Sequence, residues 1–107
     1  MKRDEIYWVT LDPVAGSEIG KTRPAVIVSM DALNRLVETV VVCPLTSQLH
    51  PEWRTRLPVK VAGKPAEIAA DQIRTVSKGR LGQKLGVLTA RDAAALRRLL
   101  GEMYAGV

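Results

Sequence analysis

Cysteine, histidine and aromatic residues are scarce in this sequence. Its 107 residues include one cysteine, one histidine and no phenylalanine, and only 4% are aromatic. A single cysteine forms no internal disulfide, and with one histidine it cannot supply the usual nitrogen and sulfur ligands of zinc. So few aromatic rings also argue against a single-strand binder built on stacked bases. We therefore expect no cofactor, although a magnesium ion held by carboxylates stays open at this point.

Long apolar runs are missing as well. No stretch approaches the ~20 apolar residues that a membrane-spanning helix needs, and residues 1–5 are not followed by an apolar secretion segment. We expect a cytoplasmic protein without a membrane partner. The length and the hydrophobic fraction of 47% suit one compact domain over residues 1–107 and exclude a two-domain enzyme.

Positive charge is in excess. There are 16 Lys and Arg residues against 11 Asp and Glu residues, which gives a formal net charge of +5. Such a surface attracts polyanions, so nucleic acid is the first partner to consider. Many small soluble proteins are basic without binding nucleic acid, and charge alone does not decide between these readings.

Short apolar and β-branched runs between turn residues predict a mainly β domain. The expected strands are residues 5–11, 24–29, 39–45, 54–61, 66–70, 73–76 and 83–87. Two of them, 24–29 and 39–45, are almost continuously apolar and suit burial on both faces. We expect a short helix over residues 30–36, a loop over residues 12–23 and a turn over residues 62–65.

The C-terminal segment has helical rather than strand periodicity. Thr89 followed by Asp92 predicts a helix start, and apolar residues then recur at helical spacing on one face, at Leu96, Leu99, Leu100 and Met103. The predicted architecture is a small SH3-like β-barrel with short helical insertions and a C-terminal amphipathic helix.

One loop resembles a phosphate-binding loop. Residues 15–22 read AGSEIGKT, a relaxed Walker A pattern. A working P-loop opens a helix whose free N–H groups bind the phosphates. Arg23 and Pro24 and then a β-branched run follow here, and the residue before a proline disfavours helix, so we do not expect an NTPase.

The same segment carries a different resemblance. DPVAGSEIGKTRPAVIVS over residues 12–29 closely resembles the signature of the MazF/PemK family of toxin endoribonucleases. PLTS over residues 44–47 looks like the second motif of that family, and ADQIRT over residues 70–75 looks like its third. The order and spacing agree across nearly the whole chain.

This resemblance implies a homodimer of SH3-like barrels that cleaves single-stranded RNA without a metal. In the implied reaction the ribose 2′-OH attacks its own phosphate, leaving a 2′,3′-cyclic phosphate and a 5′-OH. The resemblance also implies inhibition by a cognate antitoxin, which we expect to be acidic because it must cover a basic groove.

The motifs supply the candidate catalytic residues. Arg23 and Thr46 suit the stabilisation of a phosphate that gains charge, because a guanidinium fork and a hydroxyl both donate to oxyanions. The proton acceptor stays open between Asp71 and Glu18, each of which could have a raised pKa or could orient Arg23. Candidate RNA contacts lie in the motifs and in the loop over residues 47–56, which we expect to be mobile: Ser17, Lys21, Thr22, Ser47, Gln48, Trp53, Arg54, Gln72 and Arg74.

Simpler roles compete at several of these positions. Asp71 could pair with Arg74 on the surface, and the Thr46 hydroxyl could bond its own backbone. His50 has a side chain suited to proton transfer near neutral pH, but nothing in the sequence pairs it with a second group. For the whole chain, a related barrel that poisons a DNA topoisomerase without cutting and a plain RNA-binding barrel are the alternative functions.

Overall fold

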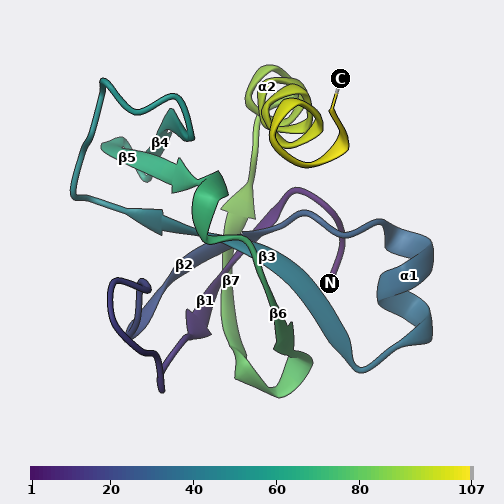
Figure 1. Cartoon of the computed structure of the whole chain (residues 1–107). Coiled ribbons are helices and arrows are strands. Elements are labelled where there is room, and N and C mark those ends of the chain that lie inside the picture. The colour runs from purple at the N-terminus through teal and green to yellow at the C-terminus, as the bar shows by residue number, and fades with distance from the viewer. Residues whose placement is uncertain (107) are drawn as a thin grey trace.

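The computed structural model describes residues 1–106, in which seven strands form one curled antiparallel sheet and a helix follows near the C-terminus (Figure 1). The strand order is β4-β5-β3-β2-β1-β7, and β6 also pairs with β3. The elements are β1 (Glu5–Thr10), β2 (Thr22–Ile27), α1 (Asp31–Leu36), β3 (Thr39–Thr46), β4 (Arg56–Val61), β5 (Lys64–Ala69), β6 (Arg74–Ser77), β7 (Leu81–Val87) and α2 (Ala90–Leu100). Single helical turns complete the fold: η1 (Ala70–Gln72), η2 (Lys78–Arg80) and η3 (Gly101–Ala105). The predicted mainly β domain with short helical insertions and a terminal helix is confirmed.

Strand β3 organises the sheet because it pairs with three other strands. Its first half pairs with β6, its end pairs with β5, and β2 runs along its other edge. Side chains on alternate faces of β2 and β3 enter two separate clusters of buried residues, so that Val26 and Cys43 belong to one and Ala25 and Val42 to the other. The predicted burial of both strands on two faces is confirmed.

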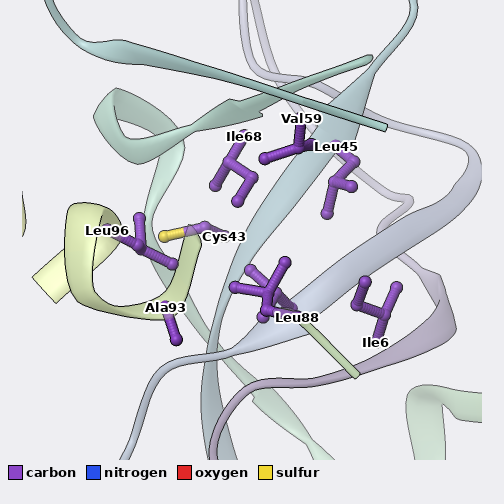
Figure 2. Packing of buried hydrophobic residues seen from close by; sticks show 9 residues of the cluster. Ile6, Cys43, Leu45, Val59, Ile68, Leu88, Ala93 and Leu96 are labelled. Carbon is purple, nitrogen blue, oxygen red and sulfur yellow. The ribbon is translucent and has the colours of Figure 1, made fainter. Parts of the chain in front are cut away.

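The helix α2 closes the first of these clusters. Thr89 begins the helix as predicted, since its Oγ1 accepts a hydrogen bond of 3.1 Å from the backbone N of Asp92. Ala93 and Leu96 of α2 lie beside Cys43 and Leu88 in the same core (Figure 2). None of the helices in residues 1–106 is long and apolar enough to cross a membrane.

Each of the seven predicted strands differs from the structure by one or two residues at one end or both, and two of these errors have a clear structural reason. β2 begins at Thr22, so Arg23 and Pro24 lie within the strand, at positions that pair only with β1 because the pairing with β3 starts at Ala25. The other error is the predicted turn over residues 62–65. Val61 pairs directly with Lys64, and Ala62 and Gly63 have φ values of 51° and 78°, which is the two-residue hairpin turn that matches strand twist.

A carboxylate fastens the edge strand β7 to β1. The Glu5 side chain lies 2.6 Å from Lys84 Nζ and accepts hydrogen bonds from Lys2 N and Tyr7 Oη. The hydrogen bond from Lys84 lowers the pKa of Glu5 to about 2, because together with the other donors it outweighs the opposing effect of burial. The ionised form of Glu5 therefore stabilises the folded state.

We predict that acid removes this contribution. As the pH falls from about 4.5 to about 2, the unfolded chain takes up a proton at Glu5 before the folded chain does, so the free energy of unfolding should decrease. Glu5→Gln should flatten this part of the pH dependence in urea denaturation, whereas Glu38→Gln, at an exposed position, should leave it unchanged. If the free energy of unfolding fell equally steeply with pH in wild type and in Glu5→Gln, the stabilising role of ionised Glu5 would be contradicted.

Candidate active site

A cleft of about 520 Å³ lies between the loop that joins β1 to β2, the first part of β2, the end of β3 and the loop that follows it. Both Arg23 and Thr46 line it. A second hollow, of about 480 Å³, adjoins the first and shares Lys21, Arg23 and Thr46 with it. Arg23 and Thr46, which lie in different motifs of the sequence, therefore border both hollows.

The sheet register explains why they meet. The β2–β3 ladder begins at Ala25, which lies opposite Pro44. Arg23 comes two residues before Ala25 and Thr46 two residues after Pro44, so both lie just beyond this end of the ladder. The register thus brings a guanidinium and a hydroxyl to one edge of the sheet.

Arg23 is oriented but not neutralised. Its Nε donates a 2.9 Å hydrogen bond to the carbonyl oxygen of Gly20, which fixes the direction of the half-buried side chain. In the part of the chain that the structure describes, no carboxylate lies within 4.0 Å of this guanidinium. Its charge and its terminal N–H groups are available to an anion in the cleft.

Thr46 is buried, with 6% of its surface exposed. Its Oγ1 accepts a 3.1 Å hydrogen bond from the backbone N of Gln48, so the local backbone contact expected for a threonine beside a turn is present. A hydroxyl that accepts one bond still has its own proton to donate. The contact therefore holds Thr46 in place and leaves it a donor.

The two candidate carboxylates lie differently from what we expected. Glu18 lines the cleft, and its Oε1 accepts a 2.7 Å hydrogen bond from Ala15 N at the exposed tip of the loop. Asp71 is not part of the cleft lining, and its Oδ1 lies 2.8 Å from Nε of Arg56. Asp71 thus orients Arg56 rather than Arg23.

Of the alternatives left open for Asp71, neither the raised pKa nor the pairing with Arg74 is found. Burial by itself raises the pKa of the Asp71 carboxyl, but hydrogen bonds from Arg56 and Thr55 outweigh it and the net pKa is lowered. Arg74, the expected partner, instead donates a 3.0 Å hydrogen bond to the carbonyl oxygen of Leu11. Asp71 lies in the 3-10 turn η1 and Arg74 begins β6, and the two side chains bond to different partners despite their proximity in the sequence.

Glu67 is the main residue of this region that the sequence reasoning missed. Only 2% of its surface is exposed, and both carboxylate oxygens accept a 2.9 Å hydrogen bond from the backbone N of His50. Nη1 of Arg56 lies 3.8 Å from Oε1 of Glu67. The available signal was a charged residue inside the apolar run over residues 66–70, since a buried charge needs a partner.

The loop over residues 47–55, which we expected to be mobile, is anchored at its centre. The rings of His50 and Trp53 are stacked, with centroids 4.0 Å apart and planes inclined by 11°. The guanidinium carbon of Arg56 lies 4.7 Å from the centroid of the Trp53 ring, within the range of a cation–π contact. His50, Trp53 and Arg56 all line the cleft, so a connected set of side chains forms one of its walls.

The remaining candidate RNA contacts divide into three groups. Ser17, Lys21 and Gln48 line the cleft. Thr22 and Ser47 line the adjoining hollow. Gln72 accepts a 3.2 Å hydrogen bond from Ile19 N, so it and Arg74 tie down the loop between β1 and β2, while Arg54 is exposed outside both hollows.

The Walker-like loop opens no helix. Residues 15–22 run directly into β2, which removes the free helical N–H groups that a P-loop needs. Over residues 1–106, no three His, Cys, Asp or Glu side chains gather in a way that could hold a metal ion. The cleft lining holds the cationic side chains Lys21, Arg23 and Arg56 as well as the carboxylates Asp12 and Glu18.

Comparison with known proteins gives these features a context. The model of a family described as the PemK-like, MazF-like toxin of type II toxin-antitoxin systems matches residues 2–104. The chain belongs to this family. Membership agrees with the three motifs and their order along the sequence.

Individual relatives of this MazF-like toxin are similar over most of their length. The endoribonuclease MazF of Staphylococcus saprophyticus is 35% identical over 97 residues, which cover 83% of this chain and 78% of that protein. The endoribonuclease EndoA of Bacillus subtilis is 33% identical over 93 residues, covering 79% and 78%. A crystal structure of MazF from Deinococcus radiodurans superposes with a TM-score of 0.85 at 26% identity, over 100% of this chain and 97% of that one. The predicted family and SH3-like fold class are confirmed.

The buried carboxylate of this MazF-like toxin leads to a prediction. Glu67→Gln keeps an acceptor for His50 N but removes the charge beside Arg56, so the free energy of unfolding should fall by about 1–3 kcal/mol in urea denaturation. Glu52→Gln, at an exposed position of the same loop, should change it by less than about 0.5 kcal/mol. A loss of stability no larger than that of the control would show that Glu67 does not hold the loop.

Proposed function

We propose that this chain is an endoribonuclease that cleaves single-stranded RNA within a type II toxin-antitoxin system. The observation that carries the proposal is the shared position of Arg23 and Thr46 on one cleft. The names of the two curated relatives, both endoribonucleases, support it. The proposed reaction is attack of the ribose 2′-OH on the adjacent phosphate, which leaves a 2′,3′-cyclic phosphate and a 5′-OH.

In this reaction Arg23 and Thr46 stabilise the transition state. The phosphate gains negative charge as the 2′-oxygen bonds to it, and donors already in place lower the energy of that charge. Arg23 offers unpaired terminal N–H groups, and Thr46 offers its hydroxyl proton. A guanidinium stays protonated at all working pH values, so Arg23 acts as a donor and not as the base.

The other candidate residues take supporting roles. We assign Asp71 to the orientation of Arg56, through their 2.8 Å contact. Glu18 shapes the loop at the mouth of the cleft. RNA contacts fall to polar and basic residues of both hollows and the loops around them: Ser17, Lys21, Thr22, Ser47, Gln48, Trp53, Arg54, Gln72 and Arg74.

The proposal extends to partners. A cognate antitoxin with an acidic segment would cover the cleft and exclude RNA, because the chain carries a net charge of +5 and no carboxylate of the described residues pairs with Arg23. We also propose a single domain over residues 1–107 that works in the cytoplasm as a homodimer. Trp8 and Leu85, on paired strands β1 and β7 and each 39% exposed, offer apolar surface for association.

A cleavage assay tests the function. Purified protein incubated with a long single-stranded RNA in excess EDTA should produce discrete fragments that carry cyclic-phosphate and 5′-OH ends. Arg23→Ala should slow the cleavage by at least about two to three powers of ten, because one preorganised donor to the phosphate is lost. RNA binding should persist, since the other cations still attract the backbone.

The controls separate the alternative functions. Arg35→Ala removes the same charge from an exposed position on α1, away from the cleft, and should cut at the wild-type rate. Intact RNA with a folded wild-type protein would reject the endoribonuclease. If that protein then bound RNA it would be a plain RNA-binding barrel, and if it inhibited a DNA topoisomerase it would be a non-enzymatic poison.

A further inference from the structure

The proposed reaction needs a group that accepts the 2′-OH proton. Asp71 and Glu18, the two carboxylates considered first, are already hydrogen-bonded to other parts of the chain. Asp71 lies outside the cleft lining and is held by Arg56, and Glu18 holds the tip of its own loop. Besides Glu18 and Asp12, the cleft contains the imidazole of His50, a side-chain type suited to proton transfer near neutral pH. It is the only histidine of the chain.

The position of His50 is fixed from two sides. Its backbone N donates to both oxygens of the buried Glu67 carboxylate at 2.9 Å. Its ring is stacked on Trp53 with the centroids 4.0 Å apart, and Arg56 contacts the same indole. A half-buried imidazole held in this way loses little freedom when it meets a substrate.

The ring nitrogens of His50 are free to act. Within residues 1–106, His50 forms hydrogen bonds through its backbone N and O only. No hydrogen bond or ion pair to another residue of this range uses its ring atoms Nδ1 or Nε2. The charged groups that face it across the cleft or through its loop are Asp12, Glu18, Lys21, Arg23, Arg56 and Glu67.

We propose that His50 is the general base of the cleavage reaction, an inference that rests on the proposed function. Neutral imidazole takes the 2′-OH proton while the 2′-oxygen bonds to phosphorus. The bond from phosphorus to the 5′-oxygen breaks, and that oxygen takes a proton from solvent. His50 then returns its proton to water, so the transesterification consumes no other reactant.

The test is the pH dependence of single-turnover cleavage under excess enzyme. Wild-type cleavage should slow by about tenfold per pH unit at the acid end, as the imidazole becomes protonated. His50→Gln should lose this dependence and cut about two to four powers of ten more slowly at pH 7.5. Trp53→Phe keeps the imidazole and an aromatic neighbour, so it should keep the acid limb.

The outcomes distinguish this inference from the proposed function. A wild-type protein that does not cut RNA counts against the function itself. A wild-type protein that cuts, together with a folded His50→Gln variant of equal rate and equal pH dependence, overturns the role of His50. A second test modifies the folded wild-type protein with diethyl pyrocarbonate, which can react with only one imidazole in this chain. RNA cleavage should be lost while RNA binding remains. Treatment with hydroxylamine should then restore cleavage. Unchanged cleavage after complete modification would also overturn the proposal.

Discussion

The pairing of β2 with β3 is the constraint on which the site depends. Both strands are buried on two faces, so a slip of one residue would exchange the side chains of the two core clusters and expose apolar groups. The pairing of Ala25 with Pro44 therefore has one stable register, and Arg23 and Thr46 lie two residues beyond that pair, where both side chains line one cleft. Core packing thus determines which polar side chains share the cleft.

Buried charged side chains also hold the cleft in place. Arg56 lies between Asp71 and Glu67, and through Trp53 and His50 it links η1 and β5 to the wall of the cleft. Desolvating such groups costs several kcal/mol per ion unless each one is paired and hydrogen-bonded. Because this cost offsets most of the attraction, the contacts of Arg56 with Asp71 and Glu67 add little net stability. They do fix the geometry of a loop that has no regular secondary structure.

Much of the fold followed from local patterns in the sequence. Alternation, apolar runs and the Thr89 cap predicted the strands and α2, and the family motifs pointed to Arg23 and Thr46. The contacts of Asp71 did not follow, because its partner Arg56 is distant in the sequence and a nearer arginine offered an obvious but wrong choice. The place of His50 depends on a carboxylate from another strand, which no pattern within its own segment reveals.

The central claim is that Arg23 and Thr46 act on one phosphate, and a double-mutant cycle on the single-turnover cleavage rate tests it most directly. Arg23→Ala removes the guanidinium, and Thr46→Val removes the hydroxyl while nearly keeping the side-chain volume. Groups that act as a unit give strongly non-additive losses, so the double variant should be about as slow as the slower single variant. Losses that multiply in full would mean that the two side chains act independently, and the account of the cleft would be wrong.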